Sequence, residues 1–562
     1  EPETEPEGED VEVEETDELD EDEMGEGAEG PFRLGWALAY ASPQYAMQDI
    51  YTCDAASNNF GYCNEEFDQA LLAANAAEGD EATQLYQDAE DILLEDFPMI
   101  PMWYSVYTTV HTDDVDNVIV DPSTYVRSEL VEAEGGEFSI HGCEPQSLLP
   151  QMSNEVCGGR VLHQLFAGLT EIDAETNEPT NVVAESIEAN DDFTEFTITI
   201  RDDFTFHDGT PVTASSFVDA WNFAANPDNG MANAPFFEQF EGYSELQAGE
   251  ADELTGLDAP DDTTIEITMA EPFAPLEAAL SHQAFYPLPE AAFDDMEAFE
   301  DAPIGNGRYQ IDGSWEREVQ IALERYEDYA GDITGSADRI TYAIYQDVNT
   351  AYLDVQAGEL DILEQVPPEM LVNVDDDFGD NVMRTDTSSF TYLGFPMYQE
   401  EWGDNLELRQ ALSLAIDREQ IIDVIFDGAM TPARSVIPPD LPEHRDDICD
   451  VCEFDEERAQ ELFEEAGGWD GTMRIYFNSG AGHEEWVEAA ANQWRDVLGI
   501  EDFEFVSLEF AQYLDLLDAG VHAILGPPFS DFGLPLLQIV DGQVPVVFVA
   551  STEAQLPHPE RR

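Results

Sequence analysis

The sequence predicts an α/β fold of about three to four domain-sized units, at roughly 150 residues per unit. Three observations support this prediction. The chain has 562 residues, which is ample for several buried cores. The stretch 193–223 has the pattern of a strand, a turn and a helix, and the stretch 63–104 has the pattern of two amphipathic helices. No apolar run approaches the roughly 20 residues that span a bilayer, so no transmembrane helix is expected.

The strand, turn and helix of residues 193–223 follow from the order of residue types. Between Phe196 and Ile200, apolar residues alternate with threonine, which is the period of a half-buried strand. The segment 207–211 (HDGTP) then reverses the chain, because its Asp-Gly pair accepts positive φ and its proline fixes the next torsion. Thr213 is expected to cap the following helix, whose apolar residues recur at helical spacing.

The charge of the chain is extreme. It carries 126 acidic residues and 18 basic ones, every basic residue is arginine, and the formal net charge is -108. Phosphate groups would be repelled, so a nucleic-acid partner is excluded. Two explanations stay open. Excess surface carboxylate suits a protein bathed in concentrated salt, which is a halophilic-like composition. Deliberate replacement of lysine by acidic residues would give the same composition.

The two ends of the chain differ from its middle in composition. Residues 1–30 are almost wholly acidic and are expected to form a disordered tail. No signal peptide is visible there, since such a segment needs basic and then apolar residues. The segment 126–136 has the composition of a connector. Residues 521–562 form an extension with few acids and many prolines, for which no structure is predicted.

Six cysteines fall into local pairs, and an even count in an exported protein favours disulfides. The pairs are Cys53 with Cys63, Cys143 with Cys157, and Cys449 with Cys452. The CxxC spacing of the last pair is also that of half a zinc site or of a redox pair. No second CxxC and no βαβ pattern accompany it, so a disulfide is expected for this pair as well.

No catalytic signature is present, so the sequence predicts a protein that is not an enzyme and that has no cofactor and no metal. It contains no GxSxG, HExxH, Walker loop or GxGxxG motif. The segment 305–309 lacks the last glycine and the βαβ setting that a dinucleotide needs. His207 and Asp208 are interpreted as turn residues rather than as a catalytic dyad. With 126 acidic residues, a pair of carboxylates in the sequence carries no information.

Several longer motifs resemble one family. The run FTITIRDDFTFHDGTPVTASSFVDAWNF at 196–223 is similar to the signature region of the family 5 extracellular solute-binding proteins, the dipeptide and oligopeptide receptors of ABC transporters. The resemblance extends to PIGNGRYQIDGSW at 303–315, DVNTAYLDVQAGELDIL at 347–363 and LELRQALSLAIDREQIIDVIFDG at 406–428. It implies a two-lobed α/β periplasmic-binding-protein fold of the large type, with an extra subdomain.

The order of the motifs departs from that of the family. Residues 31–97 resemble the end of the mature family protein, with a Gly-Trp strand, a cysteine-bracketed loop and two helices, whereas the residues from 137 onward resemble its beginning. This is the pattern of a circular permutation, which is tolerated where the original ends lie close together at the surface. The eleven residues of 126–136 reach about 35 Å when extended, enough to join two such ends.

The resemblance also implies a division of the chain into lobes. Lobe one holds 98–125, 137–185 and 300–388; an inserted subdomain holds 186–299; and lobe two holds 31–97 and 389–520. Two crossings between the lobes, near 97–101 and near 388–392, would form the hinge.

The resemblance implies a ligand cleft between the lobes, walled by aromatic and small polar residues from loops. The residues expected there are Trp36, Tyr40, Glu144, Pro145, Gln146, Phe395, Tyr398, Asn478, Ser479 and His483. Family members that grip the α-amino group of a peptide place an aspartate where Ala39 stands here. Either Glu144 replaces that aspartate or the ligand has no free amine.

The function implied by the resemblance is that of an ABC importer's receptor. It would be an extracytoplasmic, membrane-tethered monomer that captures a peptide or similar small solute and delivers it to the permease subunits. Closure of the lobes on the ligand would be the capture step. Two alternatives stay open: an engineered or rearranged binding scaffold or sensor without a transporter partner and, ranked lower, a hydrolase.

Overall fold

A computed structural model describes residues 27–525, except 54, 56, 122, 123, 175, 334, 480 and 481. The expectations for 1–26 and 526–562 lie outside these described residues. Residues 27–30, which composition assigns to a disordered tail, are part of the fold. Ala28 is buried, and the indole N–H of Trp402 donates to the carbonyl oxygen of Glu29 at 2.8 Å. At the other end, helix α17 (Phe510–Leu525) continues past the boundary expected at residue 520.

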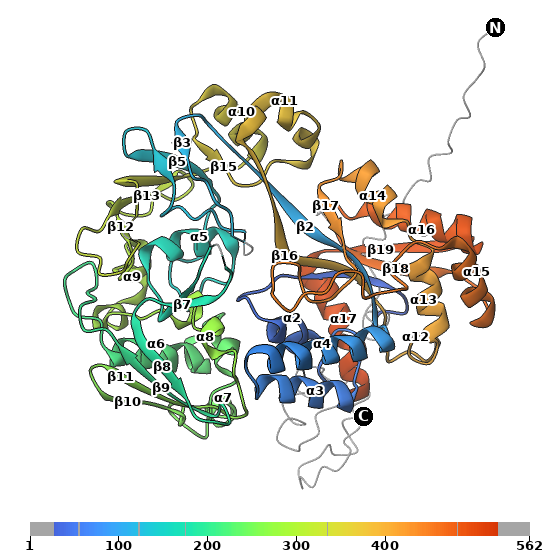
Figure 1. Ribbon diagram of the computed structural model, residues 1–562, viewed down its shortest axis with the longest axis horizontal. Coiled ribbons are helices and arrows are strands. Elements are labelled where there is room, and N and C mark those ends of the chain that lie inside the picture. The colour runs from blue at the N-terminus through green and yellow to red at the C-terminus, as the bar shows by residue number, and fades with distance from the viewer. Residues whose placement is uncertain are drawn as a thin grey trace, which may run out of the picture.

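Two lobes are joined by two long antiparallel strands, β2 (Met99–His111) and β16 (Val382–Gly394), which cross the middle of the molecule (Figure 1). Their pairing runs from Met99 opposite Gly394 to Val110 opposite Val382, with two irregularities in the register. When one lobe moves relative to the other, this strand pair must therefore bend or twist.

Both crossing strands belong to one mixed sheet that extends through both lobes. Its strands lie in the order β12 (Tyr309–Ile311), β13 (Gln320–Arg325), β14 (Arg339–Ile344), β5 (Glu137–Gly142), β15 (Ile362–Leu363), β2, β16, β1 (Phe32–Trp36), β18 (Met473–Asn478) and β19 (Phe503–Leu508). Strand β17 (Met430–Pro432) also pairs with β2.

The segment 186–299, expected as an inserted subdomain, shares one apolar core with lobe one and is therefore counted as part of lobe one. It carries a second sheet that includes the predicted strand, and the predicted turn and helix follow that strand. The sheet order is β10 (Leu257–Asp261), β11 (Thr264–Thr268), β9 (Glu195–Ile200) and β8 (Ala184–Ala189). The chain turns after β9 and enters α6 (Ala214–Ala225), whose N-cap is Thr213. The backbone N–H of Thr213 donates to Ser216 Oγ at 3.1 Å. The interpretation of this stretch from its alternation and turn residues is confirmed.

Residues 32–97 are built into lobe two and do not form a separate body. Strand β1 pairs antiparallel with β16 on one side and parallel with β18 on the other. Helices α2 (Pro43–Tyr51), α3 (Glu65–Asn75) and α4 (Gly79–Asp96) share one apolar core with residues from 433–441 and 506–517. Helix α4 ends where Phe97 adopts a left-handed conformation with φ 52°, directly before the proline that precedes β2.

The other elements are shorter or lie on the faces of these sheets. The remaining strands are β3 (Val115–Asp116), β4 (Glu132–Ala133), β6 (Thr170–Ile172) and β7 (Pro179–Asn181). The remaining helices are α5 (Val156–Leu165), α7 (Tyr243–Gln247), α8 (Leu276–Ala279), α9 (Met296–Asp301), α10 (Val348–Ala357), α11 (Val374–Phe378), α12 (Glu400–Gly403), α13 (Leu406–Leu414), α14 (Arg418–Ile425), α15 (Glu456–Glu465) and α16 (Glu484–Leu498). The 3₁₀ turns are η1 (Pro227–Asn229), η2 (Ala234–Phe237), η3 (Gln283–Phe285), η4 (Glu290–Phe293), η5 (Pro368–Asn373) and η6 (Gly379–Asn381).

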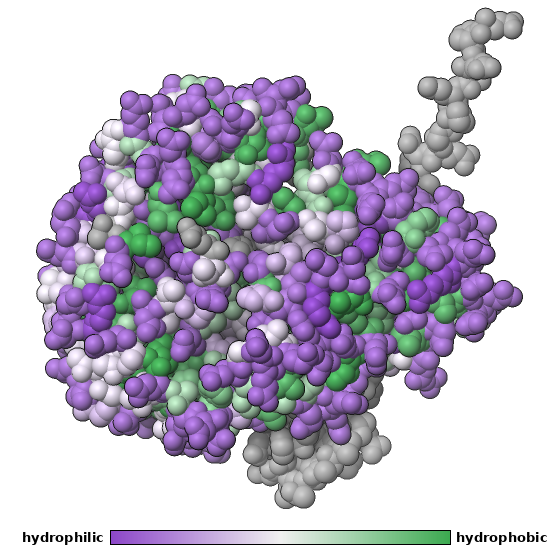
Figure 2. Space-filling model, viewed as in Figure 1, coloured by the Kyte–Doolittle hydropathy of each residue, from purple (hydrophilic) through white to green (hydrophobic). Residues whose placement is uncertain are grey.

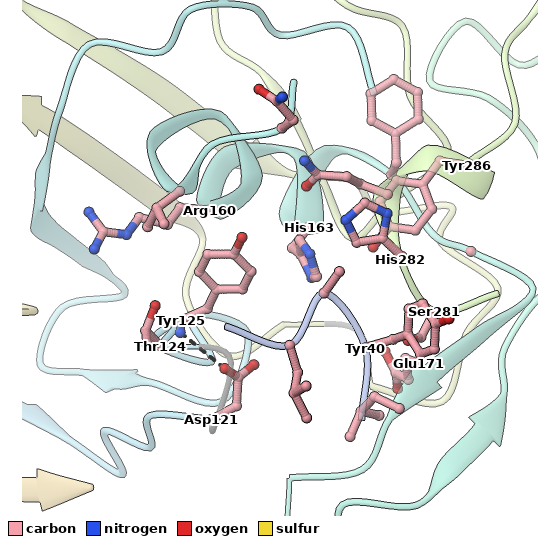
Figure 3. A pocket seen from close by; sticks show the side chains of 18 of the residues that line it. Tyr40, Asp121, Thr124, Tyr125, Arg160, His163, Glu171, Ser281, His282 and Tyr286 are labelled. Atoms are coloured by element: carbon pink, nitrogen blue, oxygen red, sulfur yellow. Dashed lines mark hydrogen bonds between the residues drawn. The ribbon is translucent and has the colours of Figure 1, made fainter. Parts of the chain in front are cut away.

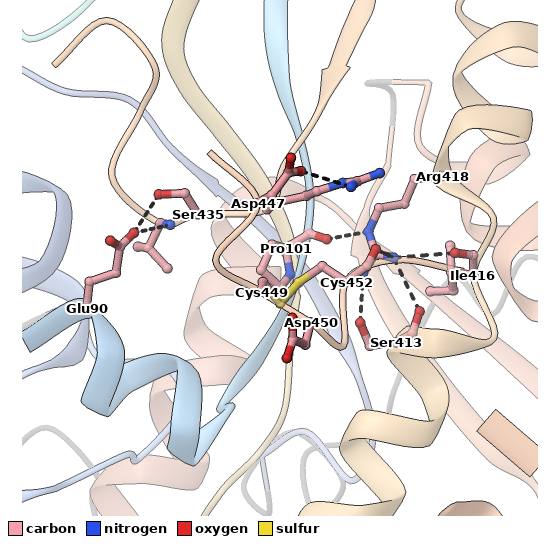
Figure 4. The surroundings of a disulfide bond; sticks show 12 residues. Glu90, Pro101, Ser413, Ile416, Arg418, Ser435, Asp447, Cys449, Asp450 and Cys452 are labelled. Atoms are coloured by element: carbon pink, nitrogen blue, oxygen red, sulfur yellow. Dashed lines mark hydrogen bonds and ion pairs between the residues drawn. A yellow bond between two sulfur atoms is a disulfide. The ribbon is translucent and has the colours of Figure 1, made fainter. Parts of the chain in front are cut away.

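The three expected disulfides are present. Because Cys449 and Cys452 are bonded to each other, their thiolates are not free to form half a zinc site. Arg418 ties this disulfide loop to the crossing strand β2 (Figure 4). Its guanidinium donates to the carbonyl oxygens of Cys452 at 2.7 Å and Pro101 at 2.6 Å. Burial lowers the pKa of Arg418 to about 9.

The surface of the molecule is mostly hydrophilic. Figure 2 shows polar residues over most of the visible face, with hydrophobic residues in small separate patches. Within the described part of the chain, no helix is both long and apolar enough to cross a membrane.

Candidate ligand cavity

A cavity of about 560 Å³ lies where the two lobes face each other. This volume is within the range of about 300–1,000 Å³ that is typical of small-molecule sites. Lobe one supplies most of the wall, and lobe two and the crossing strand supply the rest. The residues of the wall come from the segments 124–129, 154–172, 232–236 and 281–286 of lobe one together with Asp121 and Arg308, from 37–40 and Tyr45 of lobe two, and from Ser388 and Ser389 of β16.

Helix α5 forms one side of the cavity, and its first turn is fixed in two ways. Glu155 caps the helix by accepting a hydrogen bond from the backbone N–H of Cys157 at 2.6 Å. The disulfide from Cys143 to Cys157 ties the same turn to the loop after β5. Gly159 then lets Tyr125 lie directly against the helix, because a Cβ at this position would lie 2.4 Å from Tyr125 Oη. The position of Tyr125 in the wall therefore depends on this glycine.

Aromatic rings face the cavity from both lobes (Figure 3). In lobe one, the ring of His163 lies 4.8 Å from that of Tyr125 and 5.9 Å from that of Tyr286, between centroids. Tyr40 comes from lobe two. Burial lowers the pKa of His163 to about 4 and that of His282 to about 3, so both imidazoles are neutral at pH 7. These rings therefore contribute aromatic and uncharged polar surface to the cavity.

The arginines of the wall are paired with carboxylates. The pairs are Arg127 with Glu129 at 2.6 Å, Arg160 with Glu364 at 2.6 Å, and Arg308 with Glu171. Burial works to raise the pKa of Glu129, but the charges of Arg127 and Arg308 outweigh it and lower the pKa to about 2. Burial raises the pKa of Glu364 to about 7, although Arg160 opposes the shift. The cavity is thus far closer to charge balance than the chain as a whole.

Among the residues expected at the site, Tyr40 lines this cavity. Trp36 lies one layer behind the wall: its ring stacks on that of Tyr45 at 5.5 Å, and its Nε1 donates to the Tyr45 carbonyl oxygen at 3.0 Å. None of residues 144–146 is part of the described wall. The carboxylate of Glu144 accepts a hydrogen bond from the backbone N–H of Glu318 at 2.7 Å.

Two expected residues pack inside lobe two. Phe395 is 0% exposed, and its ring stacks on Trp402 with 5.3 Å between centroids. Its assignment as a ligand contact is therefore corrected to that of a core residue, because its whole side chain is enclosed. The hydroxyl of Tyr398 donates to the carbonyl oxygen of Ala28 at 3.1 Å, which ties down the segment before β1.

The last three expected residues lie at the end of β18, outside the described wall of the cavity. Asn478 Oδ1 accepts from Arg33 Nη1 at 3.3 Å, and the backbone N–H of Ser479 donates to Leu508. His483 Nδ1 accepts from the indole N–H of Trp486 at 3.3 Å. Burial, with a smaller contribution from Arg33, lowers the pKa of His483 to about 3.

Sequence reasoning missed most of the wall. Tyr125, His163, Phe236 and His282 come from four separate segments, and no spacing rule links them. Each belongs to a stretch that is typical of a loop or of a packed helix. Their common feature is their position in the folded chain, and the sequence alone contains no signal that would have grouped them.

Comparisons with known proteins identify the family. The family model of the bacterial extracellular solute-binding proteins, family 5 (middle), matches residues 178–531. The dipeptide-binding protein DppE of Bacillus subtilis (strain 168) is 26% identical over 388 residues, which cover 66% of this chain and 70% of the relative. The periplasmic oligopeptide-binding protein OppA of Salmonella typhimurium (strain LT2) is 28% identical over 393 residues, which cover 67% and 71%.

Solved structures have the same fold. The murein tripeptide-binding protein MppA of Escherichia coli has a TM-score of 0.52 at 22% identity, covering 67% of this chain and 76% of that one. The ABC transporter substrate-binding protein CtaP of Listeria monocytogenes has a TM-score of 0.54 at 24% identity, covering 66% and 74%. The predicted two-lobed α/β fold is confirmed. Because the family match spans more than half of its residues, the chain belongs to the family 5 bacterial extracellular solute-binding proteins.

Proposed function

We propose that this protein captures a peptide between its two lobes and delivers it to the membrane permease of an ABC importer. The observation that carries the proposal is the cavity whose wall comes from both lobes. A ligand that contacts both walls binds the closed arrangement better, so it shifts the population toward closure. The matched relatives are named for binding dipeptides and oligopeptides, which supports a peptide as the ligand.

The proposal includes the protein's location, its oligomeric state and the absence of catalysis. The protein would act outside the cytoplasm as a monomer tethered to the membrane, and it would carry out no catalytic step. The three disulfides support an oxidising compartment. Solute capture needs only differential binding to open and closed forms, which requires no nucleophile or cofactor.

We also propose that the chain is a circular permutant of the family arrangement. Two observations support this. Strand β1 lies near the start of the chain, yet it pairs between β16 and β18 of lobe two. The family match begins at residue 178 and leaves the segment 31–125 unmatched. The buried contacts that join Glu90 to Arg445 and residues 435–437 give a test.

Filling the cavity tests peptide capture. Ala39 lines the cavity from lobe two, and Ala39→Trp would place an indole in the space that a ligand needs. We expect the affinity for peptides to fall at least about tenfold, a loss of about 1.4 kcal/mol in binding free energy. The measurement is native mass spectrometry and calorimetry with a random tripeptide mixture in concentrated potassium chloride.

Ala73→Trp is the matched control, because Ala73 is exposed on α3. This variant should bind the mixture as the unmodified protein does. Peptide capture in this cavity would be contradicted if the unmodified protein bound no peptide, or if Ala39→Trp bound the mixture equally well.

A further inference from the structure

Two parallel aromatic rings, one from each lobe, face each other at the cavity. Tyr45 lies on α2 of lobe two and Phe236 lies in η2 of lobe one, and both line the cavity. Their ring centroids are 6.3 Å apart and their planes differ by 2°. Two rings with a planar group between them need about 7 Å, twice a van der Waals separation of about 3.5 Å. The centroid distance is the upper limit of the gap between the two planes and is shorter than about 7 Å, so the lobes must separate slightly to admit a planar group.

Each ring also stacks on a second ring of its own lobe. Trp36 stacks on Tyr45 at 5.5 Å and 29° and also hydrogen-bonds its carbonyl oxygen. His282 stacks on Phe236 with 4.1 Å between centroids and 20° between planes. Both faces are therefore in place before a ligand arrives, which lowers the entropy cost of binding.

Two carboxylates, one from each lobe, interact electrostatically with Tyr45, although neither is among the residues of the described wall. Asp49 is on α2, and Glu238 directly follows η2. Burial raises the pKa of Asp49 to about 7, and the charge of Glu238 adds to the shift. Burial also raises the pKa of Glu238. Gln239 Nε2 donates to Glu238 Oε1 at 3.3 Å, and Tyr40, Tyr45 and Tyr243 also interact with the pair. No arginine is among the groups that shift either carboxylate, so neither has a positive partner among them, although Glu238 is exposed to water.

We propose that the space between Tyr45 and Phe236 takes a guanidinium group, so that an arginine side chain of the bound peptide lies between the rings with Asp49 and Glu238 at its edge. This inference rests on the proposed capture of peptides. A guanidinium is planar, stacks on aromatic faces and donates to carboxylates through a fork of N–H groups. A neutral aromatic ring would leave the carboxylates uncompensated, and an ammonium group would not use the parallel planes.

The test compares tripeptides that differ in one side chain. In trialanine, each position in turn is replaced by arginine, by citrulline, which has the same shape without the charge, by lysine, or by phenylalanine. We expect the best arginine peptide to bind at least about fivefold more tightly than its citrulline and lysine counterparts, as measured by calorimetry at pH 8. This preference should shrink between pH 8 and pH 6, because the guanidinium binds the ionised form of Asp49 and a proton occupies that carboxyl at lower pH.

Substitutions in the protein show whether Phe236 and Glu238 cause the preference for arginine peptides. Phe236→Leu and Glu238→Gln should each remove most of it, whereas Glu241→Gln, which changes an exposed carboxylate three residues from Glu238, should leave it unchanged. Thermal unfolding of each variant shows whether it is folded. The guanidinium proposal is overturned if arginine and citrulline peptides bind alike, if a phenylalanine peptide binds most tightly, or if the preference persists in both variants. If the random tripeptide mixture binds in any of these cases, peptide capture stands; if no peptide binds at all, peptide capture fails as well.

Discussion

Replacing Glu90 by alanine is expected to lower the free energy of unfolding by about 3–5 kcal/mol. Glu90 lies on α4 and its side chain is 0% exposed. Its carboxylate accepts hydrogen bonds from the backbone N–H groups of Val436 at 2.7 Å and Ile437 at 3.0 Å. It also accepts from Ser435 Oγ at 2.6 Å (Figure 4) and from Arg445 Nη2 at 2.9 Å. The truncation leaves several buried donors without an acceptor, and this is the source of the expected loss.

The neighbouring residue provides a matched control. Asp91 also pairs with Arg445, at 2.7 Å, but its side chain is half exposed. Asp91→Ala is therefore expected to cost only about 0–1 kcal/mol. Urea unfolding in concentrated potassium chloride, followed by circular dichroism, measures both variants. If Glu90→Ala costs no more than Asp91→Ala, the segment 31–97 is not held in lobe two as described, and the circular permutation loses its structural support.

Replacing Arg160 by methionine is expected to cost about 1–1.5 kcal/mol more at pH 8 than at pH 5, because the buried Glu364 loses the partner that allows its carboxyl to ionise. The loss should depend on pH. The folded-state pKa of Glu364 is raised to about 7 from its ordinary value of 4.5, so the folded protein holds this proton more tightly than the unfolded chain. The stabilisation is full below pH 4.5 and is lost as the pH rises through 7. Without Arg160 the pKa rises further, so the variant keeps a proton that the unmodified protein releases above pH 7, and the substitution should cost more at pH 8 than at pH 5.

A double variant separates the buried charge from the other effects of the substitution. Arg160→Met combined with Glu364→Gln removes both charges, and it should recover most of the stability that the single variant loses at pH 8. Unfolding curves of the single and double variants at the two pH values measure this. Equal losses at pH 5 and pH 8, or no recovery in the double variant, would contradict the role assigned to this pair.

The sequence was sufficient for those parts of the fold that local patterns encode. Alternating threonines placed β9, the Asp-Gly turn and Thr213 placed the start of α6, and short spacing predicted the disulfides. Composition predicted a disordered tail up to residue 30, and this boundary was wrong. Ala28 and Glu29 follow an acidic stretch, yet they contact Tyr398 and Trp402. Contacts with residues that are distant in the sequence hold Ala28 and Glu29 in the fold despite the acidic stretch before them.

The site was predicted less well than the fold, for a physical reason. A cavity between two lobes is walled by whichever side chains the tertiary arrangement brings together, and no periodicity relates Tyr125 to His282. Tyr40 was found because it follows a recognisable Gly-Trp strand. Phe395 was placed wrongly, because an aromatic residue at the end of a crossing strand can point to the core as well as to the cleft.

The central claim is that a bound peptide holds the lobes together, and the distance between the lobes tests it most directly. All six cysteines are paired, so spin labels can be attached through Glu81→Cys on α4 of lobe two and Glu250→Cys beside α7 of lobe one, both at exposed positions. Pulsed electron resonance should show that the random tripeptide mixture shortens the distance between the labels, and that it does not do so in the Ala39→Trp variant. An unchanged distance in protein that has demonstrably bound peptide would contradict the account.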